Sequence, residues 1–291
     1  MSSQSTPDFD ALWDYARPDR TEMKFREILL HIPEDNPAFL ELLTQIGRAQ
    51  GLQRKYDDAH QTLNQVEQRL GLVPSRPRIR YLLERGRVFN SSGLSDQARP
   101  FFEQALLLAR QLLEDFYAVD AMHMLAIVAP PEQSLELNLQ AIHFAERSKN
   151  EKARGWLGSL YNNTGWSFHD AGEYASALAM FEKAEAWRRS RGSAEEVRIA
   201  SWCVARALRS LNRLEEALSR QSELKGELDS LGEKDGYVSE EIGECLLALG
   251  HPGEASPYFA EAYELLSRDV DLVEKETERL ARLKFIAGHS C

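Results

Sequence analysis

Cysteine is scarce in this chain of 291 residues. The three cysteines, Cys203, Cys245 and Cys291, are odd in number, lie far apart and form no C-x-x-C pair. A small secreted domain held by disulfides carries an even number of closely spaced cysteines, so this usage favours a reducing compartment. We therefore expect a cytoplasmic protein.

Long apolar runs and an excess of basic residues are also missing. No stretch approaches the 18 apolar residues of a membrane span, and the opening residues MSSQSTPDFDALWDY lack the basic region and apolar core of a signal peptide. Lysine and arginine number 35 against 46 aspartates and glutamates, which gives a net charge of −11. Because non-specific nucleic-acid binding needs a basic surface, we expect neither a membrane nor a nucleic-acid partner.

Catalytic motifs are missing too. The chain contains no phosphate-binding loop, no nucleophile elbow and no H-E-x-x-H sequence. Its seven histidines are scattered, and none has metal-ligand spacing to a cysteine or an acid. His169 and Asp170 are adjacent, but neighbours on a helix point in different directions. We expect no enzyme, no metal and no cofactor.

One spacing recurs along the chain. A glycine is followed 12, 16 and 19 residues later by alanine, phenylalanine and alanine, and a second glycine lies seven residues after the first. A glycine inside a helix costs about 1 kcal/mol against alanine, so close packing is its usual reason. Three segments have the full pattern: Gly86, Gly93, Ala98, Phe102 and Ala105; Gly165, Gly172, Ala177, Phe181 and Ala184; and Gly243, Gly250, Ala255, Phe259 and Ala262.

Weaker copies fill the remaining chain. The reference residues step by 39, 79, 40 and 38 from residue 47 to residue 243, and the step of 79 is two periods. A degenerate copy from Ala118 to Ala141, with Met122 in the glycine place and Pro130–Pro131 at the turn, fits that gap. Repeats of this length indicate a helical array. The weaker copies are Gly47, Ala59, Leu63 and Val66, and Ala205, Ala217, Gln221 and Leu224.

At these residues the chain resembles the tetratricopeptide repeat family. The glycine, a large residue three positions later (Phe89, Phe168, Leu208 and Leu246), and the alanine and phenylalanine of a second helix match that family's pattern. The usual unit has about 34 residues, whereas these have 38 to 40, as in the long-helix subgroup that includes kinesin light chains and bacterial peptide-sensing regulators. Armadillo and HEAT repeats share the period but not the Gly-to-Ala spacing. The resemblance implies an all-α, right-handed α-solenoid of about fourteen or fifteen antiparallel helices.

We predict a single array over residues 1–291. The first repeat should hold two short helices, and Asp269 to Ile286 should form one capping helix. Its apolar stripe would be Val273, Leu280 and Leu283, and its polar outer face Glu274, Glu276, Glu278, Arg279 and Arg282. The small Ala177 is expected to face Gly165. The predicted repeats cover 8–32, 37–70, 78–113, 115–148, 153–191, 194–231 and 235–267.

Each first helix has a second face that does not pack on its own partner helix. Positions six before, three before, one after and four after the glycine place share this side, roughly 130° from the core side. In the resembling family it lines a concave groove that binds peptides, and we call it the groove face. On repeats three, five and six it carries arginine, tryptophan and asparagine and no acid. The candidate binding residues are Arg80, Arg87, Asn90, Asn162, Trp166, His169, Trp202, Arg206 and Arg209.

These side chains predict a non-enzymatic adaptor or regulator that binds a protein or peptide segment. Arginine grips carboxylates bidentately, and tryptophan and arginine dominate interface energies, so we expect an acidic partner. Arg206 could stack on Trp202 and, with Arg209, present two free guanidinium groups. In the competing interpretation the tryptophans pack on neighbouring helices and the arginines are solvated. Two other functions stay open: a sensor responsive to a small ligand or signal peptide, and a self-assembling scaffold.

Overall fold

The structure is a computed structural model and describes residues 8–288. Every regular element in that range is a helix, and successive helices pack pairwise as the repeat pattern predicted. No helix within it combines the length and apolar character needed to cross a bilayer. The opening residues 1–7 and Cys291, which were included in the sequence predictions, lie outside the described residues.

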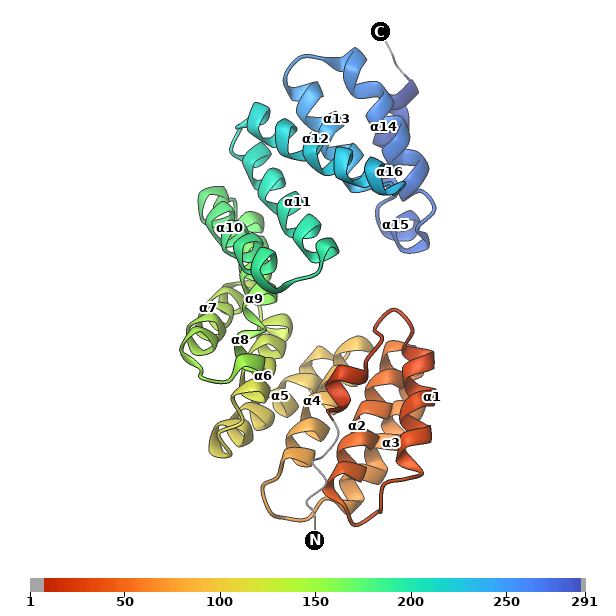
Figure 1. Ribbon diagram of the computed structural model, residues 1–291, viewed down its shortest axis with the longest axis vertical. Helices are drawn as coiled ribbons and strands as arrows, with labels where there is room; N and C mark the ends of the chain where they lie inside the picture. Colours follow the sequence, from red (N-terminus) through yellow and green to blue (C-terminus); the bar gives the residue numbers. More distant parts are fainter. Residues whose placement is uncertain (1–7, 289–291) are drawn as a thin grey trace. The chain divides into compact units, whose positions relative to one another are not determined.

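The chain divides into two compact units, an N-terminal unit that ends at Trp156 and a C-terminal unit that begins at Leu157. A single continuous array therefore stays a prediction. In the N-terminal unit the helix pairs α2–α3, α4–α5 and α6–α7 are the second, third and fourth repeats (Figure 1). Its elements are η1 Phe9–Leu12, α1 Pro18–Leu29, α2 Pro37–Leu52, α3 Tyr56–Arg69, α4 Arg76–Ser91, α5 Ser95–Gln111, α6 Asp115–Val128, α7 Pro131–Arg147 and α8 Glu151–Arg154.

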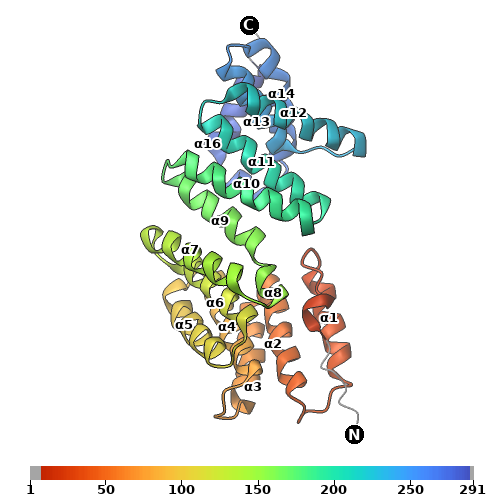
Figure 2. The same ribbon diagram turned by 60° about the vertical axis from the view of Figure 1, so that its left-hand side comes forward.

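The C-terminal unit continues the same pairing, with α9–α10, α11–α12 and α13–α14 as the fifth to seventh repeats (Figure 2). Ser193 begins α11 with a capping box, because its hydroxyl accepts from the Glu196 amide while Glu196 accepts from the Ser193 amide. The elements are α9 Leu157–Asp170, α10 Tyr174–Arg191, α11 Ala194–Ser210, α12 Leu214–Leu231, α13 Gly236–Ala248, α14 Pro252–Leu266, α15 Val270–Lys275 and α16 Thr277–Gly288.

The turn inside each helix pair has a common geometry. The residue seven after the reference position has a positive φ in five of the six predicted pairs: Arg54, Gly93, Gly172, Asn212 and Gly250. Glycine adopts this left-handed conformation freely and asparagine tolerates it, which explains the second glycine of the repeat pattern. The fourth repeat turns instead between Val128 and Pro131.

The reference glycines are needed because a phenylalanine ring of the same helix pair packs directly against them. A Cβ on Gly165 would collide with the ring of Phe181, and one on Gly86 would collide with Phe102. The alanine of the pattern, Ala177, is fully buried. The Phe181 ring is therefore the nearest neighbour of Gly165, and the expected contact of Ala177 with Gly165 stays a prediction.

Both ends of the chain depart from the predicted helices. The first repeat has one α-helix, α1, and its predicted first helix is only the four-residue 3-10 turn η1, after which the Asp14 carboxylate accepts from the Ala16 and Arg17 amides. The final helix is broken at Glu276 into α15 and α16. Leu280 and Leu283 are buried as predicted, but Val273 belongs to the other helix and is exposed.

Candidate partner-binding surface

Arg80 lies on the groove face of α4 and is almost fully buried. Its Nη1 and Nη2 donate to the two carboxylate oxygens of Asp10 at 3.1 and 2.7 Å, and its Nε lies 3.2 Å from a Glu41 oxygen. The guanidinium also lies 5.2 Å from the ring centroid of Tyr117. The side chain is only 7% exposed. The predicted binding arginine is therefore held on all sides by this chain.

Arg87 lies about two helical turns further along α4 and is also paired with carboxylates of this chain. Its Nη1 donates to Glu84 at 2.7 Å and its Nη2 donates to Asp120 of α6. Both carboxylates are 5% exposed or less. Glu84 also lies 3.4 Å from Arg48 of α2. These pairs connect the first helices of three successive repeats across the groove face.

Asn90 was expected to hold a peptide backbone. In the structure its side-chain oxygen accepts from the Ser95 hydroxyl at 2.9 Å, at the start of α5. This is an interaction inside the third repeat, between its two helices. The residue's role toward a partner stays a prediction.

The chain's own residues 8–15, which we call the N-terminal segment, cover the part of the groove face of the N-terminal unit around Arg80 and Arg48. Phe9 is buried in the core formed with α2, α4 and α6. Asp8 accepts from Lys152 of α8 at 2.6 Å, while Asp10 holds Arg80. The sequence DFDALWDY combines acids with aromatic rings. Both kinds of side chain bind arginine, so this composition could have indicated that the segment contacts an arginine-bearing surface.

The aromatic half of the N-terminal segment meets α2. The Trp13 indole Nε1 donates to Gln45 Oε1 at 3.0 Å. Trp13 stacks on Tyr15 with ring centroids 4.9 Å apart, and the Arg48 guanidinium lies 5.5 Å from each ring. A segment with acids and aromatics thus occupies part of the surface that the sequence analysis predicted to bind a partner.

The C-terminal unit instead presents a row of aromatic rings from successive first helices. Trp166 of α9 lies 6.1 Å from Trp202 of α11, and Trp202 lies 6.2 Å from Tyr237 of α13, between ring centroids. His169 adjoins Trp166 at 5.2 Å, and Asn162 accepts from the thiol of Cys203 at 3.4 Å. Burial, together with the nearby Arg206, lowers the pKa of His169, which keeps its ring neutral at pH 7.

Arg206 and Arg209 face the row but are not free. Arg209 donates from Nε and Nη2 to the two oxygens of Glu241 at 2.7 and 2.9 Å. Arg206 Nε lies 3.3 Å from the same carboxylate, and its Nη1 donates to Ser210 at 2.7 Å. Among the ring–cation contacts of the described residues, none joins Arg206 to Trp202. The prediction of two free guanidinium groups was therefore wrong, because both arginines pair with the Glu241 carboxylate. Glu241 is only 6% exposed and was not among the predicted binding residues.

The same kind of pairing ends the C-terminal unit. Arg279 donates to both oxygens of Glu240 at 2.9 and 2.5 Å and lies 5.4 Å from the Tyr237 ring, and Arg282 donates to Glu244. These two arginines were expected on a solvated outer face of the cap. They turn toward α13 instead, because α16 packs against α14 and these two side chains reach Glu240 and Glu244 on the groove face of the seventh repeat.

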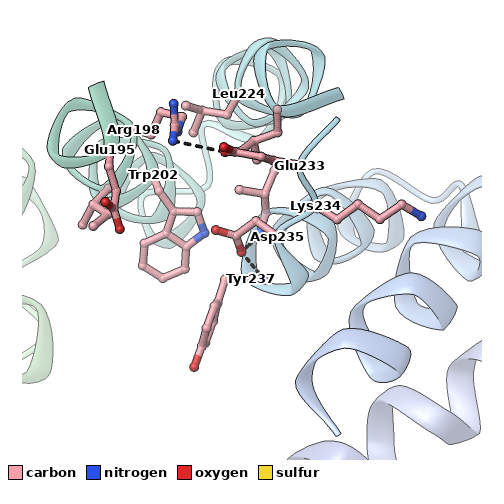
Figure 3. Close-up of a pocket in the computed structure, with 11 residues that line it drawn as sticks. Glu195, Arg198, Trp202, Leu224, Glu233, Lys234, Asp235 and Tyr237 are labelled. Atoms are coloured by element: carbon pink, nitrogen blue, oxygen red, sulfur yellow. Dashed lines mark hydrogen bonds and ion pairs between the residues drawn. The ribbon is translucent and has the colours of Figure 1, made fainter. Parts of the chain in front are cut away.

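A cavity of about 640 Å³ opens beside Trp202, between α11, the C-terminal half of α12 and the start of α13 (Figure 3). Leu224, Leu228 and Val238 give it apolar walls, and Ile199 of the groove face lines it while 54% exposed. Ligand pockets have volumes of about 300 to 1,000 Å³. In the described part of the chain no group of three possible metal ligands is found.

The comparisons with known proteins differ between sequence and structure. No protein-family model matches the sequence, and no curated protein matches it either. Solved structures do match. RapI in its apo form superposes with a TM-score of 0.70 at 10% identity, over 88% of this chain and 73% of that one. The chain has the tetratricopeptide-like repeat fold.

Two further structures extend this tetratricopeptide-like group. The putative kinesin light chain repeats from Podospora anserina match with a TM-score of 0.54 at 16% identity, over 66% of this chain and 96% of that one. NprR in complex with its cognate peptide NprX matches with a TM-score of 0.51 at 13% identity, over 92% and 76%. At these identities the likeness establishes the fold alone.

Proposed function

We propose that this tetratricopeptide-like protein is a non-enzymatic adaptor or regulator that binds a peptide segment of a partner on the groove face of its C-terminal unit. The observation that carries the proposal is the row of Trp166, Trp202 and Tyr237 beside an open cavity. Tryptophan and tyrosine contribute most to binding when they line such a surface. Free, buried Cys203 and Cys245 support a cytoplasmic setting for that partner.

The structural neighbours support a peptide as the ligand class. The solved structure of NprR contains its cognate peptide, and the present chain shares that fold over most of its length. Peptides bind well to rows of aromatic side chains because the rings lose little conformational entropy on binding.

An acidic partner is our proposal for the N-terminal unit alone. There an acidic, aromatic segment would replace residues 8–15 and would take over their contacts with Arg80, Arg48 and Lys152. This competition favours, as a second function, a sensor in which an incoming peptide releases the N-terminal segment. In the C-terminal unit Glu241 already satisfies both arginines.

Selection of a displayed random-peptide library on the full chain tests the main proposal. We expect Trp202→Ala to weaken the selected peptides at least about tenfold, whereas Trp187→Ala, on the second helix α10, should leave affinity unchanged. Thermal melting of each variant separates lost binding from lost folding. Peptides that bind the Trp202 variant as tightly as the parent chain would place binding elsewhere and refute the proposal.

A further inference from the structure

The charged groups around the cavity beside Trp202 are unequally paired. Arg198 donates to Glu227 and Glu233, each at 3.3 Å, and is mostly buried. Lys234 lies 3.0 Å from Glu261. Both cations that line the cavity are thus satisfied by carboxylates of the same unit. Three carboxylates, Glu195, Glu233 and Asp235, line the same cavity, so its acids outnumber its cations.

Two lining carboxylates are not paired in this way. Glu195, in the first turn of α11, is exposed and has no ion pair within the described residues. Asp235 caps α13, and one of its oxygens accepts from the amides of Tyr237 and Val238 at 2.8 and 3.3 Å. Neither carboxylate has a cationic neighbour within ion-pair distance in the part of the chain that the structure describes. The uncompensated charge of the cavity is therefore negative.

The Trp202 indole supplies the remaining polar group. Its Nε1 is buried and has no acceptor in the described structure, and Figure 3 shows it on the side of the ring that faces Asp235. A buried donor without a partner costs about 1 to 3 kcal/mol, so an arriving carbonyl oxygen would be favoured there. The Tyr237 ring stands at 80° to the indole. A cation placed over the face of a tryptophan ring is attracted to it.

We propose that this cavity is a subsite for an arginine side chain of the bound peptide, which deepens the proposed function and rests on it. The aliphatic stem would lie on Leu224 and Leu228, and the guanidinium would meet the Glu195 and Asp235 carboxylates beside the Trp202 ring. A backbone carbonyl of the same peptide would accept from the indole Nε1. Arginine suits this site better than lysine because its planar group both stacks and bonds bidentately.

The test uses the full chain with 15N-labelled tryptophan and three blocked peptides, Ac-Leu-Arg-Leu-NH2 and its Gln and Glu counterparts. The Trp202 indole resonance is assigned by Trp202→Phe and followed by NMR during each titration. We expect the arginine peptide to shift it with an affinity about tenfold tighter than the glutamine peptide, and the glutamate peptide to bind weakest.

Charge-removing variants complete the test. Asp235→Asn keeps an equally good helix cap while it removes the charge, and Glu195→Gln removes the other. Together they should abolish the preference for arginine, whereas Glu215→Gln, an exposed acid in the first turn of α12, should preserve it.

Each alternative outcome overturns the inference in a recognisable way. Equal binding of the three peptides at Trp202 would refute the arginine subsite while leaving peptide binding in place. A preference for the glutamate peptide would reverse the assigned charge. If no peptide shifts the Trp202 resonance although library-selected peptides bind the chain, the cavity is not the subsite, and the proposed function is judged by the library selection alone.

Discussion

The two units share one helix-pair architecture and use its groove face differently. In the N-terminal unit residues 8–15 cover that face around Arg80 and Arg48, and ion pairs of Arg80 and Arg87 join successive first helices. In the C-terminal unit the corresponding face holds a row of aromatic rings beside an open cavity. The repeat pattern therefore fixes the scaffold, while the charge and size of the groove-face side chains determine what covers it.

The comparison also separates two roles of arginine. Arg80 and Arg87, whose side chains are 7% and 13% exposed, pair with the buried carboxylates of Glu41 and Asp120, so we assign them to the stability of the N-terminal unit. Arg206 and Arg209 are half-buried and share one carboxylate. If either arginine is removed, the Glu241 carboxylate still has an ion pair with the other one.

The largest expected effect follows from this difference. Arg87→Ala should lower the free energy of unfolding by about 3 to 5 kcal/mol, because it leaves Asp120 and Glu84 buried without that guanidinium. Arg206→Ala should cost less than about 1 kcal/mol, since Arg209 still donates twice to Glu241. Denaturant unfolding followed by circular dichroism measures both. Losses of equal size would mean that groove-face arginines contribute equally to the free energy of unfolding in the two units.

An intermediate effect tests what the units have in common. Gly86→Ala in the N-terminal unit and Gly165→Ala in the C-terminal unit should each destabilise by about 1 to 3 kcal/mol, because the added Cβ collides with Phe102 or Phe181. Gly226→Ala in α12 is the matched control, since a Cβ there meets nothing within 4 Å. That control should gain up to about 1 kcal/mol from helix propensity. A gain at Gly165 would show that the ring moves aside freely.

Much of the fold could be predicted from the sequence because the repeat pattern records local packing. Gly165 with Phe181 and the turn at Gly172 depend on residues within one helix pair, so their spacing is constant along the chain. The break of the cap at Glu276 depends on how α15 and α16 meet the rest of their unit. No repeat exists there to reveal it.

The groove face was harder to predict for an electrostatic reason. A step of 100° per residue predicts that Trp166, Trp202 and Arg206 lie on the groove face of their helices, but it cannot say which acid each arginine meets. Glu241 pairs with Arg209 across 32 residues, and Asp10 pairs with Arg80 across 70. Such partners depend on how the repeats stack and on the path of the N-terminal segment. The periodicity of residues within one helix carries no information about either.

A smaller effect than that of Arg87→Ala is expected in the N-terminal segment itself. Asp10→Asn removes the charge that binds Arg80, yet Arg80 keeps Glu41 at 3.2 Å, so stability should fall by only about 1 to 2 kcal/mol. The matched control is Asp19→Asn, whose pair with Arg17 is exposed and worth little.

The consequence for binding should be larger than that for stability. Once its hold on Arg80 weakens, the N-terminal segment should be replaced more readily by a labelled synthetic peptide of residues 8–16, whose intact aspartate at position 10 can pair with Arg80. We expect the Asp10→Asn chain to bind this peptide about tenfold more tightly than the parent chain or the Asp19 variant, measured by fluorescence anisotropy at low salt. The peptide's aspartate would bind Arg80 through an ion pair, whereas its phenylalanine would bind by apolar burial, as Phe9 does in the chain. Raised salt screens only the ion pair, so it should weaken the peptide's binding without abolishing it. Identical, negligible binding by all three chains would show that the segment is a fixed part of the N-terminal unit, and the contrast between a covered and an open groove face would then be permanent rather than adjustable.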